Sequence, residues 1–360
     1  MSNGFCGKNC EVCGYYEICA GCWNPMCLLA RCLRGTTFEG ITSPRPFCTY
    51  RRICHRRAGV KIEFPPPPRL MKRRKQSKID LPSFIPTIEI SDSNSWFWPD
   101  VVRTAIIVRL GEILTDDKLK EEVSGKGLHD YLGFDGHIML STVMPDELLD
   151  RLTVDGLKVL IKDLQPDSCM VPDCYTYMDD PQLMSWQQLF KMLNQTQELS
   201  DQDMDIPVIG LVKGASRKQI IYCTERLLKV GLTTLAFPAR ELAEAKLLES
   251  FISNVTDVLQ EKRADVDLII YGLSYPIRRF PWRKTSYASM SWHIDSKYAY
   301  YYWNGLRYPA GHTSVRFNTC GCPGCKRRLA YQVASYPRDL AIHNLLELEE
   351  RFTSNEEADK

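Results

Sequence analysis

The sequence contains no long apolar segment and carries almost no net charge. Its 360 residues include 46 Lys and Arg against 44 Asp and Glu, and 44% of them are hydrophobic. No window approaches the roughly 18 to 20 apolar residues that a bilayer span requires. The first ten residues, MSNGFCGKNC, also lack the charged and apolar regions of a secretory signal. This is the composition of a soluble globular protein, so we predict a cytoplasmic location and no membrane partner.

Two phosphate-binding motifs are missing as well. There is no GxGxxG after the first predicted strand and no GxxxxGK[ST] anywhere, which removes the usual nucleotide-binding reasons for an open sheet. From about residue 100, short apolar runs alternate with helical periodicities, as in HIMLS followed by PDELLDRLTVDGLKVLIKDL. At least five successive βα units predict an all-parallel sheet, either open or closed into a (β/α)8 TIM-type barrel. We count six or seven strands, so a barrel needs one or two more.

Charge and cysteine are distributed unevenly along the chain. Residues 1–80 contain 15 Lys and Arg but only 5 Asp and Glu. The remaining residues contain 31 Lys and Arg and 39 Asp and Glu. The basic end is therefore a candidate for contacting phosphates. Nine of the 15 cysteines lie in the first 54 residues, at Cys6, Cys10, Cys13, Cys19, Cys22, Cys27, Cys32, Cys48 and Cys54. In a cytoplasmic protein, such clustering predicts metal ligands rather than disulfides.

The N-terminal cysteines predict a small metal-binding module over residues 1–60. They suffice for two four-thiolate sites, which would hold either [4Fe-4S] clusters or Zn²⁺. The spacing Cys6-x3-Cys10-x2-Cys13 matches the cluster loop of radical-SAM enzymes, but only five residues precede it, where those enzymes have a barrel strand. The basic runs RRICHRR and KRRK predict contacts with nucleic acid, with a solvated basic surface as the alternative. The Pro-rich and basic stretch over residues 61–85 is predicted to be a linker.

A second cysteine cluster lies near the C-terminus. Cys320-x-Cys322-x2-Cys325 occupies a loop with glycine and proline, and His343 follows on a predicted helix. Three thiolates and one imidazole complete a tetrahedral Zn²⁺ site and leave no position for water. We therefore predict a structural zinc subdomain at about residues 315–350. Free thiols beside a surface histidine are the alternative.

A CxCxxC loop followed by a helix with His-Asn, at the end of a βα-repeat chain, resembles the tRNA-guanine transglycosylase superfamily. Further segments match in the family's order: PDSCMVPDC at 166–174, PVIGLVKG at 207–214, a helix, strand and turn over 227–241, and IYGLSYP at 270–276. The resemblance covers about residues 130–350. It implies a (β/α)8 barrel over residues 86–360 with a zinc subdomain. It also implies base exchange in nucleic acid, in which a 7-deazaguanine replaces guanine in tRNA or DNA through a covalent Asp-ribosyl intermediate.

The resemblance implies that the base is held at the ends of the strands. Asp173 matches the aspartate that recognises a guanine-type base. Lys213 stands where the family usually has glutamine. Ser141 occupies the position of the general-base aspartate, and because a hydroxyl needs its own activating base near neutral pH, that role must move or be lost. The residues implied at base- or substrate-binding positions are Ser141, Lys213, Gly214, Tyr271 and Gly272.

The nucleophile has two alternative positions. Asp295, in Ile294-Asp295-Ser296, resembles the Asp-Ser of several family members, which predicts a pentosyltransferase with Asp295 and Asp173 as its catalytic carboxylates. In the second alternative, YASMSW is aligned with an Asp-Ser-x-x-Trp variant of the family motif. This alignment places Ala288 where the carboxylate should be. It predicts a non-catalytic, nucleic-acid-binding subunit that supports an active partner in a homo- or hetero-oligomer. A third alternative is another reaction on a deazaguanine or nucleoside, with electrons from an N-terminal cluster.

Overall fold

The computed structural model describes most of the chain after residue 77. The described residues are 78–91, 101, 104–176, 182–201, 206–240, 245–273, 282 and 284–353. The predicted metal-binding module at residues 1–60, with its nine cysteines, and most of the predicted linker lie outside these ranges. Within the described ranges, no helix combines the length and the apolar character needed to cross a membrane.

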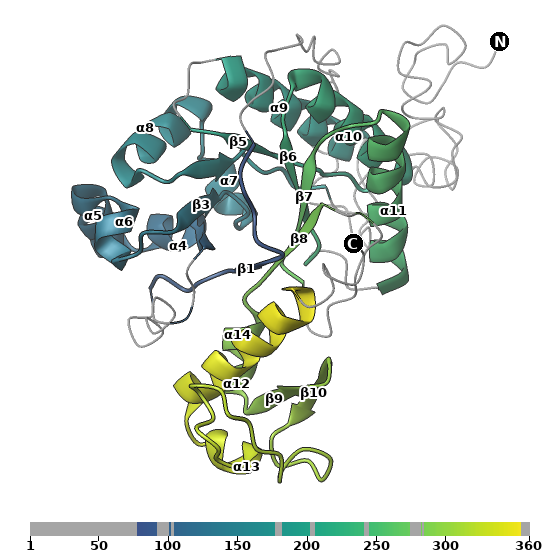
Figure 1. Cartoon of the computed structure of the whole chain (residues 1–360). Helices are drawn as coiled ribbons and strands as arrows, with labels where there is room; N and C mark the ends of the chain where they lie inside the picture. Colours follow the sequence, from purple (N-terminus) through teal and green to yellow (C-terminus); the bar gives the residue numbers. More distant parts are fainter. Residues whose placement is uncertain are drawn as a thin grey trace, which may run out of the picture.

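Eight parallel strands form a nearly closed barrel with helices around it (Figure 1). In chain order the strands are β1 (Phe84–Pro86), β2 (Ala105–Arg109), β3 (His137–Ser141), β4 (Ser168–Met170), β5 (Val208–Leu211), β6 (Thr234–Pro238), β7 (Asp267–Tyr271) and β8 (Thr285–Ser289). They pair in the order β1-β8-β7-β6-β5-β4-β3-β2. A parallel bridge between Thr87 and Ile107 joins the two ends, and the Ile88 amide donates to the Ile107 carbonyl at 3.1 Å. The chain thus has the TIM-like α/β barrel that the sequence predicts.

The strand that the sequence analysis did not identify is β1. It is only three residues long and ends in Pro86, so no alternation of apolar and polar residues distinguishes it from the preceding Pro-rich stretch. It is held by β8, where Phe84 and Ile85 pair with Tyr287 and Ala288. The barrel therefore begins before the predicted boundary between residues 85 and 86, and Ile79 is already buried.

Helices connect the successive strands from β2 to β7 on the outside of the barrel (Figure 1). They are α4 (Leu110–Thr115), α5 (Asp117–Lys126), α6 (Leu128–Leu132), α7 (Asp146–Leu149), α8 (Val154–Leu164), α9 (Gln182–Asp201), α10 (Arg217–Val230) and α11 (Ala245–Glu261). Local sequence sets their ends. The Ser216 hydroxyl accepts from the Gln219 amide at the start of α10, and Gly231 ends that helix at a φ of 94°. Helix α7 begins directly after Pro145, and α10 ends directly before Gly231.

The strands are almost completely buried because helices cover their outer side and other strands face their inner side. Ile106, Ile107 and Val108 of β2 are fully unexposed. This explains why the strands read as continuous apolar runs rather than as alternating patterns. Polar side chains gather instead where strands end, such as Arg109 on β2 and Ser141 on β3. In barrels of this class, the carboxyl ends of the strands carry the working residues.

The chain after β8 forms a smaller subdomain, drawn below the barrel in Figure 1. It contains α12 (Ser291–Lys297), the antiparallel strands β9 (Tyr300–Trp303) and β10 (Leu306–Pro309), α13 (Ala330–Val333) and α14 (Pro337–Thr353). Asn344 of α14 accepts from the Tyr302 amide at 3.0 Å and donates to the Tyr300 carbonyl at 2.9 Å. At the other end of α14, Phe352 stacks on Tyr287 of β8, with 4.3 Å between ring centroids. Helix α14 therefore joins the subdomain to the barrel wall.

Candidate functional site

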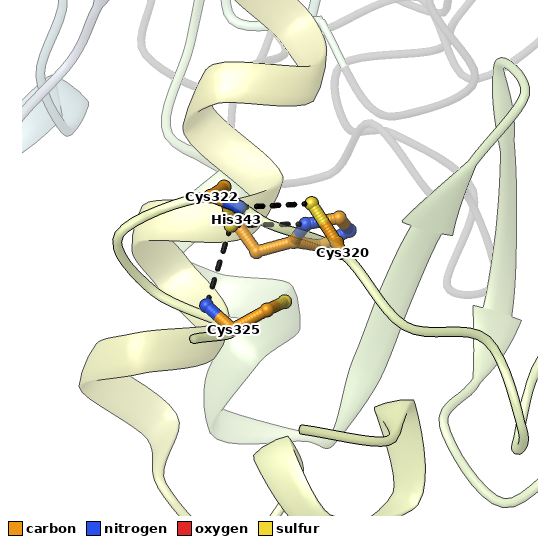
Figure 2. Close-up of side chains that lie close together, drawn as sticks. All are labelled: Cys320, Cys322, Cys325 and His343. Carbon is orange, nitrogen blue, oxygen red and sulfur yellow. Dashed lines mark hydrogen bonds between the residues drawn. The ribbon is translucent and has the colours of Figure 1, made fainter. Parts of the chain in front are cut away.

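Cys320, Cys322, Cys325 and His343 form one cluster (Figure 2). One ligand atom from each residue lies within 4.8 Å of the others. The cysteines come from the loop between β10 and α13, and the histidine comes from α14. Cys322 Sγ lies 3.6 Å from His343 Nδ1. Three sulfur atoms and one imidazole nitrogen could hold a metal such as zinc, as predicted.

The imidazole of His343 is oriented by its neighbours. Its Nε2 lies 2.8 Å from the Tyr302 carbonyl, and since a carbonyl can only accept, Nε2 donates and Nδ1 is directed toward the sulfur atoms. The Tyr301 ring stacks on the imidazole, with 4.1 Å between centroids. Burial lowers the pKa of His343, but hydrogen bonds to Cys320 and Cys322 outweigh it and raise the pKa to about 9. The sulfur atoms thus favour a positive charge among them, which suits a cation.

The cysteine loop approaches α14 closely. The Cys322 amide donates to Cys320 Sγ and the Cys325 amide donates to Cys322 Sγ, each at 3.3 Å (Figure 2). At Gly324, a Cβ atom would lie 2.2 Å from the Asp339 carbonyl oxygen and 3.0 Å from the His343 amide nitrogen. Both are backbone atoms of α14, so they cannot rotate away. Only glycine allows the loop to lie this near the helix that supplies the fourth ligand.

We expect Gly324→Ala to weaken metal binding and to destabilise the subdomain. The added methyl group forces the loop and α14 apart, at a cost on the order of 1–3 kcal/mol. Metal content and thermal unfolding measure the effect. Gly321→Ala is the matched control, because nothing lies within 4 Å of a Cβ atom there. If both variants keep the metal and the unfolding temperature of the wild type, the close approach at Gly324 is not needed.

A second cluster occupies the carboxyl ends of the barrel strands. Lys213 Nζ lies 3.1 Å from Asp173 Oδ1, and the two side chains are only 2% and 3% exposed. Asp173 follows β4 and Lys213 follows β5, and these strands pair directly. The structure thus brings together two residues that the sequence analysis singled out separately.

Tyr271 is a further polar residue at this end of the barrel. It ends β7, and Ser141 at the end of β3 lies close enough to affect the pKa of its hydroxyl group. Burial raises the pKa of Tyr271, and Ser141 and the charges of Arg109 and Arg240 offset only part of this rise. Arg109 also pairs with Glu112 of α4. Neither arginine was predicted as a site residue, although Arg109 ends the apolar strand in TAIIVRL and Arg240 closely follows the one in TTLAFPAR.

The two glycines predicted at the strand ends are explained by close backbone packing. At Gly214, a Cβ atom would lie 2.7 Å from Gln219 Cβ, at the start of α10. Gly272 has a φ of 81°, and its Cβ atom would lie 3.2 Å from Arg240 Cβ. Both positions therefore require glycine for the shape of the loops, whether or not a substrate lies beside them.

The two alternative positions of the nucleophile differ in their surroundings. Ala288 of β8 is in register with Tyr271 of β7, so its side chain faces the same side of the sheet as Tyr271, the barrel interior. Asp295 lies on α12, where its carboxylate accepts from Tyr302 Oη at 2.7 Å and pairs with Arg307 Nη1 at 3.1 Å. Among the described residues, Asp295 and Asp173 thus belong to separate groups of interacting side chains.

These features define an α/β barrel with a Cys3His cluster and a charged cluster at its strand ends. No family model matches the chain, and no curated protein is significantly similar to it in sequence. The class of protein is therefore defined by the barrel and the two clusters. The resemblance to tRNA-guanine transglycosylases rests on the sequence motifs alone.

Proposed function

We propose that this chain is a transglycosylase-like barrel that binds a guanine-type base of nucleic acid at its strand ends without exchanging it. The observation that carries the proposal is the Asp173–Lys213 pair, with 3.1 Å between its charged atoms. It lies at the barrel end where Ser141 and Ala288 stand at the positions at which the family resemblance requires carboxylates. Such a protein holds the base and supports an active partner.

The Asp173–Lys213 pair is complementary to the pairing edge of guanine. That edge presents one carbonyl acceptor beside two N–H donors, and 7-deazaguanines share it. An ammonium group only donates and a carboxylate only accepts, so Lys213 suits the carbonyl and Asp173 suits the N–H groups. Adenine presents a donor where guanine has its carbonyl, so it would place an N–H group against the Lys213 ammonium, which cannot accept. Because both side chains are nearly unexposed, the base has to leave its stack to reach them.

The remaining side chains support binding rather than exchange. Exchange needs a carboxylate that attacks the C1′ atom and a base that takes a proton from the incoming base. Ala288 offers neither group, and Ser141, whose hydroxyl accepts from the Val143 amide at 3.3 Å, offers no carboxylate. The Asp295 carboxylate is engaged by Arg307 and Tyr302 within the subdomain. A nucleophilic role for Asp295 would require these two contacts to break.

The Cys3His cluster is proposed to hold a structural Zn²⁺ ion. Cys320, Cys322, Cys325 and His343 fill the four positions that such a site needs, so none is left for a substrate. A metal bound there would tie the cysteine loop to α14. Through Phe352, α14 contacts the strand that carries Ala288.

Calorimetry with free bases tests the proposal. We expect guanine and 7-deazaguanine to bind and adenine not to bind. Asp173→Asn replaces an acceptor oxygen with a donor, so it should weaken guanine binding at least about fivefold, given about 1–3 kcal/mol per unsatisfied buried group. Asp155→Asn is the matched control, since that side chain is 86% exposed. Equal binding of adenine and guanine, or unchanged guanine binding by Asp173→Asn, would contradict base recognition by this pair.

A further inference from the structure

The subdomain after β8 has a strongly basic segment that recognition of a base in the barrel does not use. Residues 296–338 contain seven Lys and Arg and no Asp or Glu. The acidic residues that flank the segment are engaged, Asp295 with Arg307 and Asp339 with Arg328. The segment therefore carries a strong positive charge, and its exposed members include Arg316, Lys326 and Arg327.

Exposed aromatic side chains lie among these basic residues. Phe317 is 62% exposed and Tyr331 is 45% exposed. Their ring centroids are 6.5 Å apart, with an angle of 84° between the rings. The Arg316 guanidinium lies over the Phe317 ring, 4.3 Å from its centroid. Large rings left in contact with water beside cations mark a surface that a partner covers.

Backbone pairing places these residues on two adjacent stretches of the chain. The Tyr331 amide donates to the Arg316 carbonyl at 3.4 Å, and the Arg327 amide donates to the Cys320 carbonyl at 3.0 Å. Between these two bonds, Thr319 and Leu329 form an antiparallel bridge. The two stretches thus run side by side, with Phe317 and Tyr331 at one end and Arg327 at the other. We call Arg316, Phe317, Lys326, Arg327 and Tyr331 the basic-aromatic strip.

Two of the cations occupy backbone positions that do not favour them. Lys326 and Arg327 have φ values of 51° and 62°, in the left-handed region that glycine and asparagine adopt more easily. The cysteine loop fixes this conformation, because the Lys326 amide donates to the Cys322 carbonyl at 3.0 Å. The backbone alone would therefore favour glycine, and two adjacent long cations in this conformation indicate a role for their charges.

We infer that the basic-aromatic strip binds single-stranded nucleic acid. Lys and Arg neutralise phosphates, and exposed rings stack on bases whose faces are free. A duplex keeps its bases stacked on one another, so Phe317 and Tyr331 would find no partner in it. The inference rests on the proposed function for the identity of the ligand, but it uses a different surface from Asp173 and Lys213.

Fluorescence anisotropy of the full chain with labelled 12-nucleotide strands, over a series of salt concentrations, tests the inference. The three ligands compared are single-stranded RNA, single-stranded DNA of the same sequence, and duplex DNA. The first two show whether RNA or DNA is preferred. Arg316→Gln/Lys326→Gln/Arg327→Gln should lower the slope of log affinity against log salt by about 2 for a single strand, at about 0.7 per phosphate. Phe317→Ala/Tyr331→Ala should weaken single-strand binding at least about fivefold and duplex binding less.

The matched control is Lys118→Gln/Lys120→Gln/Lys126→Gln, which removes three exposed cations from α5. It should change the slope less than the strip variant does. Metal content shows that the Cys3His cluster is intact in each protein. A strip variant that behaves like the control, or an aromatic variant that weakens duplex and single strand equally, overturns the inference.

Guanine binding separates this inference from the proposed function. If strip variants lose binding of single strands while their guanine binding is unchanged, the role of the strip is supported. This holds whether or not Asp173→Asn weakens guanine binding. If Asp173→Asn abolishes guanine binding while strip variants bind strands as the wild type does, the proposed function stands and the strip is rejected.

Discussion

Cys322→Ser is expected to remove one equivalent of metal and to unfold the subdomain while the barrel stays folded. Hydrogen bonds, first from Cys325 and also from His343, hold the pKa of the Cys322 thiol well below its usual value, against the opposing effect of burial. The side chain is therefore a thiolate at neutral pH, and a serine hydroxyl cannot replace it as a ligand. Structural zinc contributes an apparent 10–16 kcal/mol to the folding of small zinc domains, so losing one ligand should have a large effect.

Metal analysis and hydrogen exchange measure this result. Backbone amides between β10 and α14 should exchange much faster in Cys322→Ser, whereas those of β6 and β7 should not. Cys174→Ser is the matched control, because Cys174 is a buried thiol outside the cluster. Its metal content should equal that of the wild type. Unchanged metal content and exchange in Cys322→Ser would show that the cluster is not a structural metal site.

Lys213→Met is expected to destabilise the barrel by about 3 kcal/mol, since it leaves the buried Asp173 carboxylate without its cation. For a barrel of this size, that corresponds to a fall in Tm of roughly 6–12 °C. The apolar stem of methionine fills much of the space of lysine, so the lost charge rather than a cavity dominates. Thermal or urea unfolding measures the change.

The double variant Asp173→Leu/Lys213→Met tests this explanation. Replacing both charges with apolar groups removes the carboxylate that has lost its cation, so the double variant should recover part of the stability lost in Lys213→Met. If the loss in the double variant equals the sum of the losses in Lys213→Met and Asp173→Leu, the pair has no coupling energy. The electrostatic account of the strand-end cluster would then be wrong.

The sequence predicted most of the fold because strands and helices in a barrel repeat one local pattern. Seven of the eight strands follow from apolar runs bounded by turns, and the helix ends at Pro145 and Gly231 follow from local backbone chemistry. Strand β1 could not be found this way, because its three residues gain their structure from pairing with Tyr287 and Ala288, about 200 residues away. Its identity depends on tertiary context rather than on local pattern.

In the candidate sites too, features set by local sequence could be predicted and features set by tertiary contacts could not. The Cys3His cluster was predictable, since its ligand spacing is itself the chemical signal. The partners of acidic residues were not, because ion pairs join residues that are distant in sequence. Asp173 pairs with Lys213, and Asp295 pairs with Arg307. A carboxylate that looks catalytic from its flanking residues can thus be one half of a salt bridge between two elements.

The most direct test of the account is to incubate the protein with tRNA and DNA that carry labelled guanine, scoring label release and trapped covalent adducts. Wild type and Asp295→Ala are compared, with filter binding of the same nucleic acids measured in parallel. We predict that the wild type retains nucleic acid but releases no label and forms no adduct. Release together with an adduct, both lost in Asp295→Ala, would contradict the proposal and establish base exchange with Asp295 as nucleophile.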